Sequence, residues 1–379
     1  MHKQPIFEAR TFGYHTYRIP GIAIAPGGVI LATAEARPGK GGDWDFNEIV
    51  IRRSEDGGEN WDDQRLIVRA SDYGDGPASN FCMIPDAELG CTHAVFCHNY
   101  NRIFYTRTDD DGLSFADPVD ITFVAEVYRE DYPWRVVATG PAHGIKTSKG
   151  RLIVPLWMSD GSGSEFGAGH LGHRPSNVAG IYSDDGGRTW AAGDAVARDH
   201  QHVSYRTSTA SVVNPSETIP VELSDGRILF NLRTESSPHK RMISISRDGA
   251  TGWGEPQFDD DLTDTVCMAS IIRLDEAGSV LFAAPDNMDH DMPWGNRVNC
   301  DRKRLSAKLR LDDCTTWSVN RIIEEGPAGY SDLAVAADGT ILCLYECGQI
   351  TRMGDDKYCM LARFDREWIE KGNRIRDEA

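Results

Sequence analysis

A short turn signal recurs along the whole chain and constrains the fold more than any other feature. In six places a glycine is the second residue of a turn between short runs rich in Val, Ile, Leu and Phe. The six turns are Gly27-Gly28, Leu89-Gly90, Lys149-Gly150, Asp225-Gly226, Ala277-Gly278 and Asp338-Gly339. Asp-Gly and Gly-Gly pairs are typical of type I′ hairpin turns, in which both central residues have positive φ. Successive turn glycines are 52 to 76 residues apart, so six repeats occupy the chain.

A second repeat has the pattern Ser-x-Asp-x-Gly-x-x-Trp, here called the Asp box. It is complete at residues 54–61 and 183–190, and degraded at 108–115, 246–253 and 310–317. Its Asp can accept bonds from backbone N–H groups of its own turn, and its Gly permits positive φ. We therefore interpret the Asp boxes as structural elements of the repeat and not as catalytic carboxylates.

The two repeats together predict the fold class. Helical periodicity is confined to a short stretch at 366–371, and the rest reads as short apolar strands. Six units of about four strands each predict an all-β, six-bladed β-propeller, formed by residues 1–379 as a single domain. A β-solenoid is the alternative, but its repeats are normally shorter.

Composition excludes several function classes. The net charge of -18 repels nucleic acid and anionic membranes, so neither is an expected partner. No apolar run reaches the roughly 18 residues of a membrane span. The first eight residues lack the apolar core of a signal peptide, so a cytoplasmic protein is expected, or a secreted one if a leader was removed. The nine cysteines form no Cys-x-x-Cys pair, so reduced thiols, no metal site and no cofactor are expected.

Three hairpins predict where charged residues meet, because a two-residue turn fixes which residues face each other. In the first hairpin we expect Arg18 opposite Arg37, with Glu35 diagonal to Arg18. In the second we expect Glu217 level with Thr234 and beside Arg233. In the third we expect Tyr330 level with Cys347 and beside Glu346. Like charges directly opposite each other are destabilising, so the two arginines need a carboxylate or an anionic ligand. If the blades superpose, all these groups converge on one face around the central channel.

Several motifs resemble those of the exo-sialidases (neuraminidases) of cells and bacteria. They are Tyr17-Arg18-Ile19-Pro20, Ala34-Glu35-Ala36-Arg37, residues 139–145 (Thr-Gly-Pro-Ala-His-Gly-Ile), Tyr330-Ser331-Asp332-Leu333 and the Asp boxes. The resemblance extends from about residue 15 to residue 365. It implies a retaining exo-α-sialidase that removes terminal sialic acid from glycoconjugates, needs no cofactor and forms one catalytic domain over residues 1–379.

The resemblance also implies a role for individual residues. Three arginines bind the substrate carboxylate, and here they are Arg18, Arg233 and Arg302. Arg304 competes with Arg302 for the third position, and Arg297 fits less well. A sialic acid carries its carboxylate on the anomeric carbon, which repels a carboxylate nucleophile and favours a neutral tyrosine.

The tyrosine nucleophile implied by the resemblance is Tyr330, and Glu217 is the base that takes its proton. Asp43 is the expected acid/base that protonates the leaving oxygen, with Asp45 as the alternative. Glu346 resembles the residue that orients the first arginine. Arg37 resembles an arginine near the O4 side of the sugar.

One element departs from the family pattern. Relatives often carry Asn-Pro near the pocket for the N-acyl group, whereas this chain reads Ser79-Asn80-Phe81-Cys82. Asn80 is therefore a substrate-binding candidate in a pocket of different shape, and Trp157 lies either by the glycerol tail or in the core. The partner that the resemblance implies is a sialylated glycan or another nonulosonic-acid glycoside. The alternatives are thus a hydrolase of deaminated sialic acid or Kdo, or a non-catalytic glycan-binding propeller.

Overall fold

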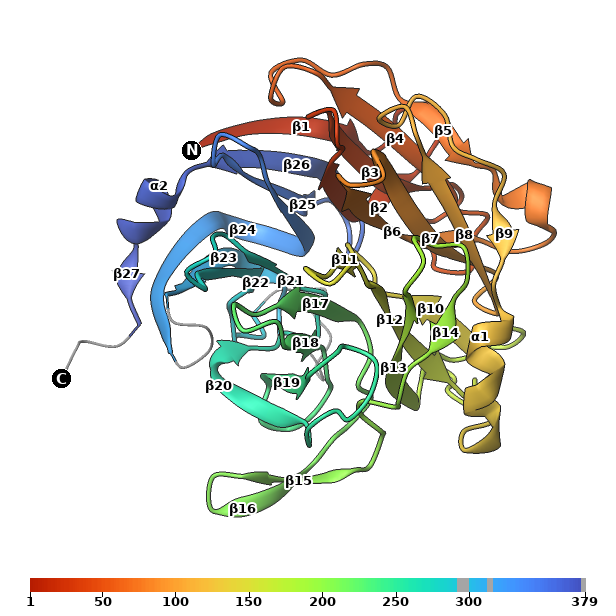
Figure 1. The fold of residues 1–379 in the computed structure, drawn as a ribbon, viewed down its shortest axis with the longest axis vertical. Coiled ribbons are helices and arrows are strands. Elements are labelled where there is room, and N and C mark those ends of the chain that lie inside the picture. The colour runs from red at the N-terminus through yellow and green to blue at the C-terminus, as the bar shows by residue number, and fades with distance from the viewer. Residues whose placement is uncertain (292–299, 312–315, 376–379) are drawn as a thin grey trace.

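Antiparallel sheets surround a central axis in the computed structural model, which describes residues 1–291, 300–311 and 316–375 (Figure 1). Blades 1, 2 and 4 are separate four-stranded sheets. Their strands are β2 (Thr16–Ile24), β3 (Ile30–Arg37), β4 (Glu48–Ser54) and β5 (Arg65–Val68) in blade 1; β6 (Ala78–Asp86), β7 (Cys91–His98), β8 (Arg102–Thr108) and β9 (Val119–Asp120) in blade 2; and β17 (Thr218–Glu222), β18 (Ile228–Leu232), β19 (Lys240–Ser246) and β20 (Gln257–Thr263) in blade 4.

Blade 3 is a sheet of five strands, and a separate hairpin follows it. The strands of blade 3 are β10 (Val136–Thr139), β11 (Ile145–Lys146), β12 (Leu152–Ser159), β13 (Ser176–Ser183) and β14 (Ala191–Ala192), and those of the hairpin are β15 (His202–Tyr205) and β16 (Ser208–Ser211). Helical segments are short: the 3-10 helices η1 (Ala70–Tyr73) and η2 (Val127–Glu130), and the α-helices α1 (Phe123–Glu126) and α2 (Arg366–Glu370). The last of these confirms the helix expected near residues 366–371.

Blades 5 and 6 form one eight-stranded sheet, because a single long strand belongs to both. This strand is β24 (Trp317–Val335), whose first part pairs with β23 and whose second part pairs with β25. The remaining strands are β21 (Ser270–Arg273), β22 (Val280–Pro285), β23 (Lys303–Arg310), β25 (Ile341–Gln349), β26 (Asp356–Phe364), β27 (Asn373–Arg374) and β1 (His2–Glu8).

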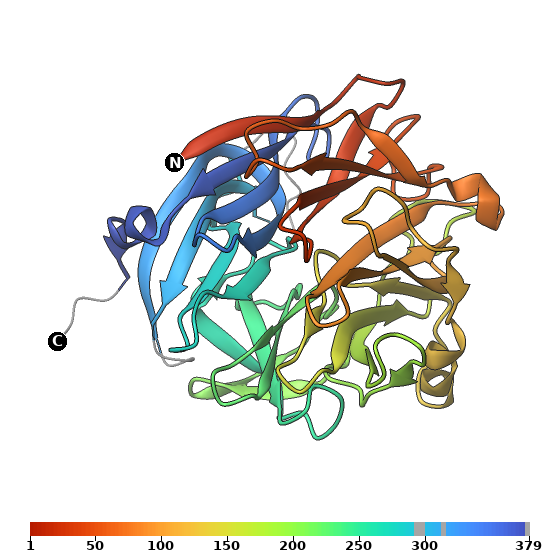
Figure 2. The same cartoon turned by 45° about the horizontal axis from the view of Figure 1, so that its top comes forward.

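Strand β1 pairs with β26, so the start of the chain completes the last blade. Figure 2 shows this N-terminal strand, in red, beside the C-terminal strands in blue. The second strand of each of the first five blades is buried along its whole length. These strands lie between neighbouring strands and blades, which explains their nearly continuous apolar sequence. The all-β propeller predicted from the repeats is confirmed.

The three hairpin turns for which type I′ is expected, those at Gly28, Gly226 and Gly339, differ from that type. In each of these described turns the second residue, a glycine, has positive φ, whereas the residue before it does not. In the first turn, Gly28 N–H donates to Ala25 O (2.8 Å) and Ala25 N–H donates to Val29 O (2.9 Å), which leaves three residues in the loop. This is a three-residue hairpin with one left-handed glycine and not a type I′ turn. The prediction of type I′ turns is therefore wrong, and the expected pairing shifts by one residue.

The shift corrects the predicted facing of Arg18 and Arg37. Arg18 pairs with Glu35 and Arg37 pairs with Thr16, and the register changes again between Arg18 and Gly21. Ile19 adopts a φ of 54° at this irregularity. A bulge of this kind redirects the side chains beside it. The two arginines are thus not opposite each other, and each receives its own carboxylate.

The other two hairpins are corrected in the same way. Glu217 is level with Arg233 and not with Thr234, because Arg233 N–H donates to Glu217 O (3.0 Å). In blade 6 the register changes between Ala328 and Ser331, so Tyr330 lies on a bulge beside Glu346 and is not paired with Cys347.

The Asp boxes stabilise their own turns, as expected. In the first box, Asp56 Oδ1 accepts bonds from Ser54 Oγ (2.8 Å) and from the backbone N–H of Asn60 (2.9 Å). These bonds, with the Asn60 backbone first, lower the pKa of Asp56 to about 2. Trp61 Nε1 donates to Gly58 O (3.2 Å). The fifth box includes Asp312 and lies partly outside the described residues.

A buried aspartate joins four blades around the axis. Asp332 Oδ1 lies 2.7 Å from His143 Nδ1 and 3.0 Å from Ser270 Oγ, and Asp332 Oδ2 accepts from Ile22 N–H (2.8 Å). These partners belong to blades 3, 5 and 1, while Asp332 lies on β24 two residues after Tyr330. Strand β24 is therefore fixed against its neighbours at the point where it passes the axis.

The thiols and the helices agree with two further expectations. The eight cysteines in the described residues are free and buried, so the prediction of unpaired thiols holds for them. The ninth, Cys314, lies outside those residues. No described helix has both the length and the apolar character that a membrane crossing requires.

Candidate active site

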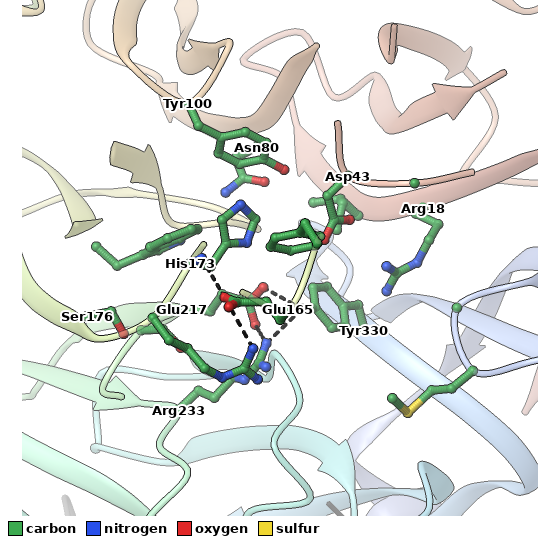
Figure 3. A pocket seen from close by; sticks show the side chains of 18 of the residues that line it. Arg18, Asp43, Asn80, Tyr100, Glu165, His173, Ser176, Glu217, Arg233 and Tyr330 are labelled. Carbon is green, nitrogen blue, oxygen red and sulfur yellow. Dashed lines mark hydrogen bonds and ion pairs between the residues drawn. The ribbon is translucent and has the colours of Figure 1, made fainter. Parts of the chain in front are cut away.

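A cavity of about 390 Å³ lies at the axis of the propeller, and every blade contributes to its wall (Figure 3). One representative from each blade, in order, is Arg18, Asn80, Trp157, Glu217, Arg302 and Tyr330. The lining is mainly polar and includes five arginines besides Arg302: Arg18, Arg37, Arg174, Arg233 and Arg352. Since the chain as a whole is acidic, this local concentration of positive charge marks a site for an anion.

Tyr330 and Glu217 form the centre of the cavity. The Tyr330 hydroxyl donates a hydrogen bond to Glu217 Oε1 and accepts one from Arg233 Nη1 (2.8 Å). Burial, followed by the charge of Glu217, raises the pKa of Tyr330 although the nearby arginines oppose that shift. Burial also disfavours ionised Glu217, but Arg233, together with the hydrogen bond from Tyr330 and the charge of Arg302, outweighs burial and lowers the pKa of Glu217. The pair is thus a neutral phenol beside a carboxylate that can accept its proton.

Three arginines surround this pair. The guanidinium carbons of Arg18 and Arg302 lie 4.9 Å and 5.1 Å from the centre of the Tyr330 ring. Arg233 contacts both Tyr330 and Glu217 directly. Arginine presents a planar set of donors that matches a carboxylate. The structure therefore places Arg18, Arg233 and Arg302 together, where they could hold a carboxylate above the phenol.

Glu346 holds the first of these arginines in place. Its Oε1 and Oε2 atoms lie 3.1 Å from Arg18 Nε and Nη2. The same carboxylate accepts bonds from the backbone N–H groups of Ile19 (3.0 Å) and Tyr330 (3.2 Å). Glu346 thus connects the Arg18 bulge of blade 1 to the Tyr330 bulge of blade 6, and it does not itself line the cavity.

The candidates for the third arginine differ in where they lie relative to the cavity. Arg302 lines the cavity and donates from Nη2 to Val266 O (2.5 Å). Arg304 is exposed and is not part of the cavity wall. Arg297 lies outside the described residues.

Asp43 and Arg37 line the cavity together, and Figure 3 shows Asp43 near Arg18. Arg37 Nη1 donates to Asp43 Oδ1 (2.6 Å), and its Nε and Nη2 donate to Glu35 Oε2 (2.9 and 2.6 Å). Burial favours the neutral form of Asp43, but Arg37, together with His173 and Arg18, outweighs burial and lowers the pKa of Asp43. Asp45 points into its own loop, where Oδ2 accepts from Gly42 N–H (2.9 Å) and Lys40 N–H (3.2 Å). Asp45 therefore shapes the loop that presents Asp43.

Asn80 and Trp157 both reach the cavity. Asn80 has a φ of 58°, and its backbone N–H donates to Glu35 Oε1 (2.8 Å) while Nδ2 donates to Thr139 O (2.9 Å). The side-chain amide of Asn80 therefore already makes one hydrogen bond within the protein. Trp157 is buried but lines the cavity. Its ring centre lies 5.0 Å from that of His173.

Sequence reasoning missed an aromatic wall that contains His173. The ring centre of His173 lies 4.7 Å from that of Tyr100 and 4.4 Å from that of Phe166. Burial lowers the pKa of His173 to about 4, so its ring is neutral near pH 7. His173 and Phe166 come from residues 160–175, a connection with five glycines that shows no strand or helix periodicity. The sequence therefore offered no signal for them.

A charged cluster beside the aromatic wall was also missed. Arg174 Nε donates to Glu235 Oε1 (2.8 Å), and Arg174 Nη1 lies 3.4 Å from Glu165 Oε1. All three residues line the cavity. Glu235 follows Arg233 by two residues, the spacing that keeps side chains on one face of an extended chain. That spacing could have identified Glu235.

The described residues contain no group of three or more His, Cys, Asp or Glu side chains that could hold a metal ion. The fold and the cavity define a class of protein: a six-bladed β-propeller with an arginine-rich axial pocket around a tyrosine–carboxylate pair. The family model for the BNR repeat-like domain matches residues 28–343, so the chain belongs to that family.

Curated relatives have the name that the sequence motifs anticipated. The chain is 28% identical over 386 residues to a sialidase of Micromonospora viridifaciens, which covers 94% of this chain and 52% of the relative. It is 28% identical over 447 residues to human sialidase-4, with 93% and 91% of the two chains covered. The expected resemblance to the sialidases is confirmed. The chain spans about half the length of the Micromonospora relative and 60% of a Bacteroides fragilis sialidase.

Solved structures show the same fold. The Hadza microbial sialidase Hz136 aligns with a TM-score of 0.77 at 22% identity, covering 97% of this chain and 69% of that one. The intramolecular trans-sialidase of Ruminococcus gnavus aligns with a TM-score of 0.71 at 17% identity, covering 97% and 98%.

Proposed function

We propose that this chain is a retaining exo-α-sialidase that hydrolyses terminal sialic acid from glycoconjugates. The observation that carries the proposal is the hydrogen bond from the Tyr330 hydroxyl to Glu217, within a cavity where Arg18, Arg233 and Arg302 surround the phenol. The sialidase names of the relatives support the substrate class.

The arginines account for substrate binding. The substrate carboxylate lies among Arg18, Arg233 and Arg302, and this contact fixes the anomeric carbon next to the Tyr330 oxygen. Charge-assisted bonds from arginine to a carboxylate are among the strongest that proteins make. A neutral phenol can approach the anionic sugar where a carboxylate nucleophile would be repelled.

The first chemical step forms a bond between the Tyr330 oxygen and the anomeric carbon. Glu217 takes the phenol proton, the glycosidic bond breaks, and Asp43 donates a proton to the leaving oxygen. In the second step Asp43 takes a proton from water, whose oxygen attacks the anomeric carbon. The Tyr330 oxygen leaves and recovers its proton from Glu217. Two displacements at one carbon give net retention.

A two-substrate assay tests the proposal. The substrates are the methylumbelliferyl α-glycosides of N-acetylneuraminic acid and of its deaminated analogue. Tyr345→Phe is the matched control for Tyr330→Phe, because Tyr345 is a buried tyrosine that also donates to a glutamate, Glu324 (3.1 Å), but does not line the cavity.

Turnover of the first glycoside that is lost in Tyr330→Phe and kept in Tyr345→Phe is the expected result. Turnover of the deaminated glycoside alone would retain the mechanism and change the substrate to another nonulosonic acid. A folded wild-type protein that hydrolyses neither glycoside would contradict the proposal.

A further inference from the structure

Three soft donor atoms meet outside the axial cavity, between β22 and β23. Cys300 Sγ lies 3.8 Å from Met288 Sδ and 3.8 Å from His290 Nε2. Cys300 is 1% exposed, whereas Met288 is 50% exposed. The thiol therefore forms the floor of a small site, and the thioether and imidazole stand at its open side.

A separate set of bonds holds the two segments that carry these donors. The buried Asn287 donates from Nδ2 to Asp289 O (3.2 Å) and to Asp301 O (2.9 Å). Asp301 N–H also donates to Asp289 O (2.9 Å). These hydrogen bonds alone therefore hold Cys300 beside Met288 and His290.

Two nearby carboxylates are engaged by a cation. Lys303 Nζ lies 2.6 Å from Asp291 Oδ1 and 3.3 Å from Asp289 Oδ2. Hard divalent ions such as Mg²⁺ and Ca²⁺ need several oxygen ligands, and these two carboxylates are already paired with lysine. The donors that approach one another are instead one thiol, one thioether and one imidazole.

We propose that Met288, His290 and Cys300 form a binding site for a soft monovalent metal ion, Cu(I). Thiolate and thioether ligands together select Cu(I) over Zn²⁺ and the harder ions. Metal bonds to sulfur and nitrogen of about 2.0–2.3 Å place three donors about 3.5–4.0 Å apart around a trigonal ion. The two measured separations of 3.8 Å lie in that range.

Binding converts the thiol to a thiolate. The Cys300 S–H bond breaks, a bond from sulfur to copper forms, and the proton leaves to solvent, so binding weakens in acid. The site does not depend on the proposed sialidase activity, although Cys300 lies two residues before Arg302.

The test is an anaerobic competition titration of the full chain with Cu(I) held by the chromogenic chelator bicinchoninate. Met288→Leu removes only the thioether sulfur at an exposed position, and Cys300→Ser removes the thiol. Cys91→Ser is the matched control, because Cys91 Sγ also lies near an imidazole, 3.6 Å from His93 Nε2, but both residues are buried. Thermal melting checks the folding of each variant.

The wild type and Cys91→Ser are expected to take up one Cu(I) and to melt at a higher temperature when loaded. Met288→Leu and Cys300→Ser are expected to bind Cu(I) at least about tenfold more weakly, a loss that even outer-shell changes can cause. X-ray absorption of the loaded wild type should show two sulfur donors and one nitrogen donor. A wild type that takes up no Cu(I), or a Met288→Leu variant with unchanged affinity, would overturn the proposal.

Discussion

The Tyr330 hydroxyl lies between a base and a cation: its proton is directed to Glu217 Oε1, and its oxygen accepts a bond from Arg233 Nη1 at 2.8 Å. Arg233 also forms an ion pair with Glu217. In the proposed mechanism the proton moves to Glu217 and negative charge develops on the Tyr330 oxygen, where Arg233 already donates. Donors aimed in advance at developing charge stabilise a transition state without reorganisation.

Loss of the base should therefore slow the first step. In Glu217→Gln the amide cannot take the phenol proton, so we expect kcat to fall by about 10²–10⁴, the usual contribution of a general base. The control is Glu324→Gln, which changes the glutamate beside Tyr345. Fluorogenic kinetics measure both, and a kcat of Glu217→Gln within threefold of the wild type would exclude this role.

The third arginine can be tested against its near neighbour. Arg302→Ala removes a guanidinium beside the Tyr330 ring, and we expect kcat/KM to fall about 10–100-fold, as loss of a charged hydrogen bond does. Arg304→Ala removes an exposed arginine two residues away and should change kcat/KM by less than about twofold. Equal effects of the two substitutions on kcat/KM would contradict the assignment of Arg302.

Asp43 should matter most when the leaving group is poor. From sialyllactose the leaving group is lactose, a basic alkoxide that needs a proton, whereas methylumbelliferone leaves readily without one. In Asp43→Asn we expect turnover of sialyllactose to fall by about 10²–10⁴ and turnover of the fluorogenic substrate to fall much less. Asp45→Asn keeps an oxygen acceptor for the backbone of its loop and should retain both activities. The reverse pattern would make Asp45 the acid.

The pH profile should report the contact between Arg37 and Asp43. Because Arg37 lowers the pKa of Asp43, the protonated acid is available only at low pH and kcat/KM should decline as pH rises. In Arg37→Gln the opposing effect of burial remains, so the pKa of Asp43 rises and the declining limb moves to higher pH. Arg102→Gln, which breaks a surface pair with Asp120, is the control. A limb that stays in place in Arg37→Gln would show that another group controls it.

The repeat pattern was sufficient to predict the propeller but not its exact registers. The six glycines marked real turns, but their loops contain three or four residues and the residue before each glycine lacks positive φ, so none is a two-residue type I′ turn. The bulges at Ile19 and Tyr330 have no local signature, because both are stabilised by Glu346 across two blades. A carboxylate more than 300 residues away in sequence thus decides how Arg18 is presented.

The cavity residues likewise fall into two groups, those that a sequence pattern predicts and those that only tertiary contacts place. Tyr330, Glu217 and Arg233 lie on or beside regular strands, where spacing and family motifs predicted them. Asp43 lies in the loop between β3 and β4, and the family resemblance predicted it there. His173 and Phe166 lie on an irregular connection whose path depends on packing against Tyr100 and other distant residues. Their place in the wall follows from tertiary contacts that no local pattern encodes.

The covalent step can be observed directly. In a sialyl fluoride with a second fluorine at C3, the fluoride on the anomeric carbon leaves readily. The C3 fluorine slows the second displacement, so the glycosyl-enzyme accumulates. Mass spectrometry of the digested protein should then find the sugar on the peptide that contains Tyr330, and none on that peptide in Tyr330→Phe. An active wild type that carries the sugar on another residue, or that releases the inverted anomer first, would contradict a tyrosine nucleophile and a retaining mechanism.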